Sequence, residues 1–151
     1  MMAGAGQRTE MLLFRQGGEL FALALRAALE VRELPTLEAV PEMRHGMLGV
    51  FPMRGSYVPV YAPEAALGLP PAASHAALLM LRRGAGAIGI ALEDVEDVIT
   101  VDLSRLHHPH PVAAGAGVLL GVERRGPDLV GIVDADALVD ACAQPRTGEP
   151  E

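Results

Sequence analysis

Short apolar runs separated by Gly and Pro dominate the chain, and they predict paired strands rather than helices. Residues 11–15 and 20–25 flank the pair Gly17-Gly18, which tolerates positive φ angles and therefore predicts a β-hairpin. Three further pairs of runs have the same form: 47–53 with 56–61, 76–82 with 87–92, and 118–124 with 129–134. Many short strands at regular spacing favour an all-β barrel or sandwich.

Helical patterns are few and short. Residues 63–67 begin with Pro and are followed by Gly68, the residue order that is typical of a helix start and end. Residues 135–141 predict a closing helix, with Asp134 or Asp136 near its N-cap. We therefore expect a β protein that ends in a short C-terminal helix.

The two halves of the chain resemble each other. When the sequence is aligned with itself so that Leu12 falls on Leu79, residues 12–34 match residues 79–101 and Arg15 falls on Arg82. Each half then reads as strand, Gly turn, strand, tight bend and strand. The Pro- and Ala-rich stretch 69–74 is the best candidate for the linker between them.

Chain length decides how these halves combine. Neither half has enough residues to bury a good core alone, so we expect two small β-barrels that share an apolar seam. The prediction is one domain over residues 11–142, with residues 1–10 and 143–151 as flexible termini.

Composition narrows the possible functions. The chain of 151 residues is half apolar and has a formal net charge of −7, which argues against nucleic-acid binding because an acidic surface repels phosphate. The single Cys142 cannot form an internal disulfide, which favours a reducing compartment. No run is long and apolar enough to cross a bilayer, and the first residues lack the apolar stretch of a secretory signal. We expect a cytoplasmic protein without direct membrane insertion.

Candidate chemistry is sparse. The stretch His107-His108-Pro109-His110 is the one dense histidine cluster, and we interpret it as an exposed loop; the alternative is a small ligand- or metal-binding β module. His45 and His75 are isolated and are predicted at the surface or in turns. The acidic run 93–97 predicts a solvated face. No nucleophile motif or phosphate-binding loop occurs, so the sequence predicts no enzyme, no metal site and no cofactor.

The Arg54-Gly55 turn between two apolar strands is the most unusual surface feature. Arg is a poor choice for a turn that only reverses the chain, and its planar guanidinium suits bidentate pairing with a carboxylate. That carboxylate is either internal, from Glu30 or Glu33, or belongs to a partner.

The order of motifs around this turn resembles the CheW-like domain family, the adaptors of bacterial chemosensory arrays. The family core Leu-Gly-Val-x-x-x-Arg-Gly-x-x-x-Pro-Val is similar to residues 48–60. Other family patterns are similar to residues 21–33, 88–98 and 130–138, so that the resemblance runs from about residue 11 to residue 141. The chain departs from the family at Pro52, where Asn is usual, and at Ala62, where Asp is usual.

The resemblance implies a fold of two five-stranded SH3-like β-barrels around a hydrophobic seam. It implies a scaffold that couples methyl-accepting receptors to a CheA-type histidine kinase, or an adaptor of a type IV pilus or other chemosensory-like pathway. The expected partners are the regulatory domain of the kinase, the cytoplasmic tip of the receptor and other CheW-like domains. The family's contact residues fall on Ala28, Glu30, Gly49 and Arg54. An apolar notch at Ala28, close approach of a helical partner at Gly49 and orientation by the two charges suit this role.

Overall fold

The computed structural model describes residues 8–43, 46–108 and 116–143, which form ten strands and one α-helix. The strands are β1 (Arg8–Gln16), β2 (Glu19–Ala24), β3 (Ala28–Glu33), β4 (Met47–Met53), β5 (Ser56–Tyr61), β6 (Ala77–Arg83), β7 (Gly86–Leu92), β8 (Asp94–Asp102), β9 (Leu119–Arg125) and β10 (Asp128–Val133). The α-helix is α1 (Ala135–Ala143), and the short 3-10 turns are η2 (Leu25–Ala27), η3 (Leu103–Arg105) and η4 (Ala116–Val118).

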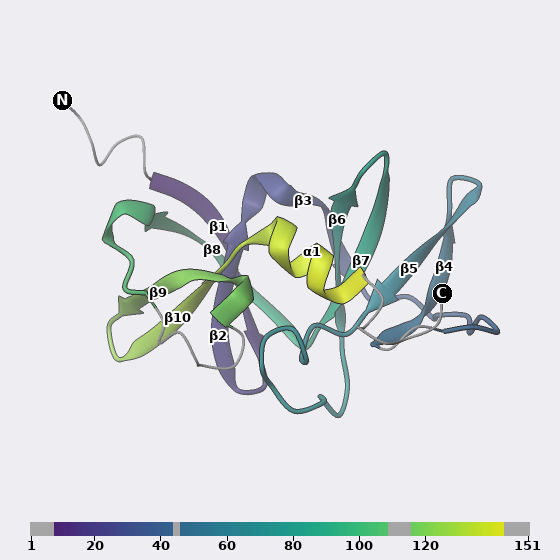
Figure 1. The fold of residues 1–151 in the computed structure, drawn as a ribbon, viewed down its shortest axis with the longest axis horizontal. Coiled ribbons are helices and arrows are strands. Elements are labelled where there is room, and N and C mark those ends of the chain that lie inside the picture. The colour runs from purple at the N-terminus through teal and green to yellow at the C-terminus, as the bar shows by residue number, and fades with distance from the viewer. Residues whose placement is uncertain (1–7, 44–45, 109–115, 144–151) are drawn as a thin grey trace.

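The strands form two five-stranded sheets, in the orders β8-β1-β2-β10-β9 and β3-β6-β7-β5-β4 (Figure 1). Neighbouring strands are antiparallel except for the parallel pairs β2–β10 and β5–β7. The last three strands of each half join the sheet formed by the first two strands of the other half. β3 pairs with β6 and β5 with β7, and β8 pairs with β1 and β10 with β2. The all-β prediction with two five-stranded units is confirmed, and the exchanged strands tie the two units together.

The pairing registers are the same in both halves. Leu12 pairs with Leu23 in β1–β2, and the matching residues of the second half, Leu79 and Ile90, pair in β6–β7. The hairpins β4–β5 and β9–β10 correspond in the same way, because Gly49 pairs with Val60 and Gly121 pairs with Ile132. Most positions in one half therefore have a defined equivalent in the other half.

Three clusters of buried side chains make up the core. The largest lies between the sheets, and α1 crosses the front of this seam in Figure 1 and adds Leu138 and Val139 to it. Phe14 and Phe21 stack there, with ring centroids 5.8 Å apart. Each sheet also encloses a smaller cluster of its own, one around Ile132 and one around Phe51. Strands β1, β6 and β7 are covered on both faces, which explains their continuous apolar runs.

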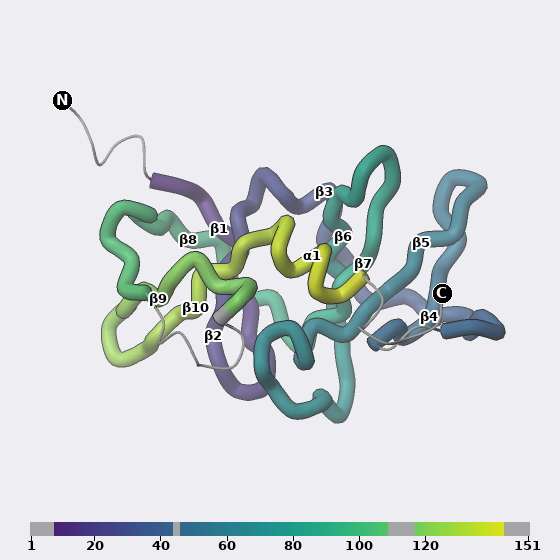
Figure 2. The backbone as a smooth tube through the Cα atoms, in the orientation of Figure 1, coloured from purple at the N-terminus to yellow at the C-terminus, as the bar shows by residue number. Residues whose placement is uncertain are grey.

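Local differences from the predicted elements have physical causes. Residues 63–67 form a single turn instead of the predicted helix, because Gly68 (φ 75°) ends it at once and one turn alone does not propagate. This turn belongs to the connection between β5 and β6, an open loop at the lower centre of Figure 2. β1 begins at Arg8, so residues 8–10 are strand rather than part of a tail. Helix α1 is capped by Asp134, whose Oδ1 accepts a 3.0 Å hydrogen bond from the Asp136 N–H.

Candidate functional site

A cleft of about 460 Å³ opens on the sheet that contains β4 and β5. Its walls come from the start of β3, the β4–β5 hairpin and the β6–β7 hairpin. Val58 and Met80 are buried beneath it, and Leu29 is 45% exposed along it. The charged residues that line it are Glu30, Arg54 and Arg82. Two of the four residues implied by the resemblance, Glu30 and Arg54, thus meet at one cleft.

A β-bulge explains why two neighbouring residues of β3 both line this cleft. Ala28 pairs with Leu81 and Glu30 pairs with Met80, so Leu29 has no partner of its own in β6. A bulge interrupts the regular alternation of side chains between the two faces of a strand. Leu29 and Glu30 therefore present an apolar and an acidic side chain next to each other.

Arg54 has a strained backbone. It lies in the left-handed region with φ 51°, and Gly55 follows with φ 82°. Positive φ at both central residues is the type I′ pattern, which favours Asn, Asp or Gly at the first position. A longer side chain in this conformation costs about 1–2 kcal/mol. Such an outlier points to a functional reason for the Arg54 side chain.

The intramolecular alternative for Arg54 is not formed. Among the residues that the structure describes, Arg54 has no ion pair, and Glu30 Oε2 instead lies 3.5 Å from Arg32 Nη1. Both side chains of the Glu30–Arg32 pair are well exposed, so this pair contributes little to stability. The guanidinium of Arg54 therefore has no carboxylate partner among the described residues.

Gly49 is buried and Ala28 is half-buried, and neither residue lines the cleft. A Cβ on Gly49 would lie 2.8 Å from the Glu38 carbonyl oxygen and 2.9 Å from Leu37 Cβ. Residues 37 and 38 cross the outer edge of β4 here, where Glu38 and Val50 exchange two 2.8 Å backbone hydrogen bonds. Ala28 is half-buried and packs against the shared core. The chain's own backbone already makes the close approach for which glycine was expected to serve a helical partner.

The same arrangement occurs in the other half. A Cβ on Gly121 would lie 2.8 Å from Leu106 Cβ and 2.9 Å from the His107 carbonyl oxygen. The sequence carried a sign of this, because the triplet Leu-Gly-Val at 48–50 recurs at 120–122. Glycine at both positions is a requirement of the fold.

The structure describes only the first two residues of the stretch His107-His108-Pro109-His110. His107 and His108 are exposed, and His107 bridges to Val122 through backbone hydrogen bonds. Pro109 and His110 lie outside the described residues, so the alternative of metal binding by this stretch is not tested. Within residues 8–43, 46–108 and 116–143, no group of three or more His, Cys, Asp or Glu side chains is arranged to hold a metal ion. In the same ranges, no helix has the length and apolar character needed to span a bilayer.

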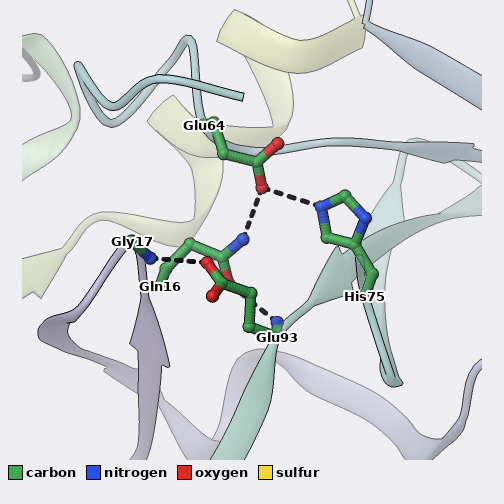
Figure 3. A network of polar contacts seen from close by, with 5 residues as sticks. All are labelled: Gln16, Gly17, Glu64, His75 and Glu93. Atoms are coloured by element: carbon green, nitrogen blue, oxygen red, sulfur yellow. Dashed lines mark hydrogen bonds and ion pairs between the residues drawn. The ribbon is translucent and has the colours of Figure 1, made fainter. Parts of the chain in front are cut away.

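A buried polar network was not foreseen from the sequence (Figure 3). Gln16 is fully buried; its Nε2 donates to Glu64, and its Oε1 accepts the Glu93 N–H at 2.9 Å. Glu64 Oε2 lies 2.9 Å from His75 Nε2, and the Glu93 carboxylate accepts the Gly17 N–H at 2.5 Å. These residues come from the β1–β2 turn, the β5–β6 connection and the β7–β8 bend. The network therefore links the β5–β6 connection to the β1–β2 turn of the first half and to the β7–β8 bend of the second half.

The network corrects two expectations. His75, predicted at the surface or in a turn, has a side chain that is only 10% exposed. Glu93, predicted on a solvated face, binds the β1–β2 turn, although Asp94, Glu96 and Asp97 of the same run are exposed as expected. The contacts of Gln16 and Gly17 span 48 to 77 positions, so no local pattern marks them.

Because the thiol of Cys142 is buried, we expect the protein to lose stability in alkaline solution. Burial, and secondarily the nearby Glu64 carboxylate, raises the pKa of its thiol to about 12. Above about pH 9 the thiol therefore ionises in the unfolded chain and stays protonated in the folded one, so unfolding releases a proton. We expect the free energy of unfolding to fall by up to about 1.4 kcal/mol per pH unit from about pH 9 to about pH 12.

Denaturant unfolding of the wild type and of Cys142→Ala across this range measures the effect. The chain contains no lysine, so few other groups titrate there. The variant is expected to show the shallower pH dependence. Equal slopes for both proteins would contradict the argument.

Comparison with known proteins gives a consistent result. The model of the CheW-like domain family matches residues 10–143 of this chain. A relative from Rhizobium etli, described as a probable chemotaxis protein CheW, is 31% identical over 96 residues, which cover 61% of this chain and 61% of the relative. The scaffolding protein TtCheW from Thermoanaerobacter tengcongensis superposes with a TM-score of 0.78 at 18% identity, over 93% of this chain and 90% of that chain. The structural likeness confirms the predicted fold of two SH3-like barrels.

Proposed function

Because this chain belongs to the CheW-like domain family, we propose that it is a non-catalytic, cytoplasmic adaptor of a bacterial chemosensory complex. In this proposal it couples the cytoplasmic tip of a methyl-accepting receptor to the regulatory domain of a CheA-type histidine kinase. The observation that carries the proposal is the cleft, where Arg54 lies without an internal ion pair to any described residue, beside Leu29 and Glu30. An apolar surface with charges around it suits a protein partner that is oriented by charge and held by burial.

The four predicted residues have different roles in this proposal. Glu30 and Arg54 contact the partner directly, because both line the cleft. Ala28 starts the bulge that turns Leu29 towards the cleft, and Gly49 lets residues 37 and 38 cover the edge of β4. Contacts of this size are weak individually, and an array gains strength by engaging many copies at once.

Other CheW-like domains are included among the proposed partners. Exposed apolar side chains recur at equivalent positions near the hairpin tips, with Tyr57 64% exposed and Leu129 55% exposed. The hairpins that carry them, β4–β5 and β9–β10, lie at opposite ends of the molecule (Figure 1). Two ends with similar apolar character suit end-to-end contact with domains of the same fold.

Titration of the purified protein against the kinase regulatory domain and against the receptor tip tests the proposal. Saturable binding to both is expected, and Arg54→Glu or Glu30→Arg should weaken binding to the partner that occupies the cleft at least tenfold. Arg105→Glu is the matched control, because Arg105 is exposed in η3, outside the cleft and outside both hairpins, and it should change binding less than twofold.

Arg54→Asn separates binding from folding. Asn tolerates a φ of 51°, so this variant should be at least as stable as the wild type and yet bind weakly. Absence of saturable binding by the folded wild-type protein to either partner would contradict the proposed function.

A further inference from the structure

Arg82 lies in the same cleft and was not among the residues implied by the resemblance. It is exposed near the end of β6, and within the described residues neither it nor Arg54 forms an ion pair. The acidic residue of the cleft, Glu30, lies beside Arg32. Two guanidinium groups without an ion pair to the described chain thus line one cleft of a protein whose net charge is −7.

The duplication of the fold provides an internal comparison. The residue equivalent to Arg82 in the first half is Arg15 of β1. Arg15 Nε donates a 2.8 Å hydrogen bond to Glu96 Oε2. This hydrogen bond raises the pKa of Arg15, and the charges of Asp128 and Asp94 raise it further. Arg15 therefore has an ion pair with one carboxylate, and two further carboxylates of the chain favour its charge.

None of these three carboxylates has an acidic equivalent beside Arg82. Glu96 is the unpaired residue of a β-bulge in β8, and Leu29 is the unpaired residue of the corresponding bulge in β3. The alignment of Leu12 with Leu79 makes Asp94 equivalent to Ala27. The correspondence of the hairpins β9–β10 and β4–β5 makes Asp128 equivalent to Ser56. The backbone is repeated, but the acids are replaced by apolar or neutral residues.

We propose that Arg82 and Arg54 together bind carboxylates of a partner segment in which Asp or Glu residues flank an apolar side chain that enters the cleft. This inference rests on the proposed function and specifies the partner chemistry of the same site. The two guanidinium groups supply the charge, and Leu29, Val58 and Met80 supply the apolar surface. Arg binds a carboxylate through two parallel hydrogen bonds, so the site selects for charge and for geometry.

Two measurements test the inference. The first compares the wild type with Arg82→Gln, Arg82→Lys and the neighbouring Arg83→Gln in titrations with the kinase regulatory domain and the receptor tip. Arg83 is exposed and does not line the cleft, so it is the matched control. Arg82→Gln should weaken binding to the cleft's partner about tenfold, Arg82→Lys less, and Arg83→Gln less than twofold. Added salt should weaken wild-type binding more than binding by Arg82→Gln.

The second measurement does not depend on either signalling protein. A phage-displayed library of random peptides is selected on the wild type and on Arg82→Gln, with thermal unfolding to verify that both are folded. Peptides with Asp or Glu around an apolar residue should be enriched on the wild type and lost on the variant. Equal acidic content on both proteins, or equal binding by Arg82→Gln and Arg83→Gln, would overturn the inference and leave the proposed function standing. Failure of both signalling proteins to bind would reject the proposed function, and the peptide selection would still decide the role of Arg82.

Discussion

A single methyl group at position 49 is expected to lower the free energy of unfolding by about 2–4 kcal/mol. Gly49 has φ 151°, where other residues are strained, and a Cβ there would lie 2.8 Å from the Glu38 carbonyl oxygen. The neighbour is backbone, and it is held by two hydrogen bonds to Val50, so it cannot move without breaking the cover over β4. Denaturant unfolding of Gly49→Ala measures this loss.

Two further glycine variants serve as comparisons for Gly49→Ala. Gly121→Ala introduces the same kind of clash in the other half and should cost about 1–3 kcal/mol. Gly117→Ala adds a methyl group with no atom within 4 Å and should leave stability nearly unchanged. If Gly49→Ala unfolds at the wild-type denaturant concentration but no longer binds its partner, then position 49 acts through direct contact and the steric argument is wrong.

Much of the fold could be predicted because its turns are marked locally. Gly17-Gly18 and Arg54-Gly55 stand between apolar runs, and the predicted strands 47–53 and 56–61 match β4 and β5. Asp134 before an apolar helix face marked the start of α1. These features depend on residues close in sequence, whose conformational preferences act without tertiary contacts.

The pairing of strands between the two halves could not be predicted from local patterns. β3 and β8 alternate weakly between polar and apolar residues, and nothing in that pattern states which sheet they join. Both pair with the first strand of the opposite half because that arrangement buries the seam on β1 and β6. The choice is therefore made by packing of the whole chain, which a local pattern does not contain.

The residues of the candidate site could also be predicted only in part from the sequence. The resemblance pointed to Glu30 and Arg54, which the structure brings to one cleft, but it did not point to Leu29 or Arg82. Leu29 lines the cleft because a bulge changes the direction of side chains, and a bulge depends on pairing between β3 and β6. The importance of Arg82 is visible only beside its equivalent Arg15, whose carboxylate partners it lacks among the described residues.

Removal of the buried amide of Gln16 is expected to destabilise the protein by about 2–4 kcal/mol. Gln16→Leu keeps the side-chain volume nearly constant, yet it leaves the Glu93 N–H without its acceptor and takes one of two donors from Glu64. Both Gln16 and Glu64 are buried, so water does not replace the lost hydrogen bonds. The loss is measured by denaturant unfolding at neutral pH.

A double-mutant cycle decides whether the network acts as a unit. Glu64→Leu removes the carboxyl group to which Gln16 donates, so the double variant Gln16→Leu, Glu64→Leu no longer leaves that buried polar group without its donor. We expect the double variant to be more stable than the sum of the two single losses predicts, by about 1–2 kcal/mol. Additive losses would show that Gln16 and Glu64 contribute separately. The β5–β6 connection would then be held to the β1–β2 turn by packing, such as the contact of Leu69 over Gly17, and not by the polar network.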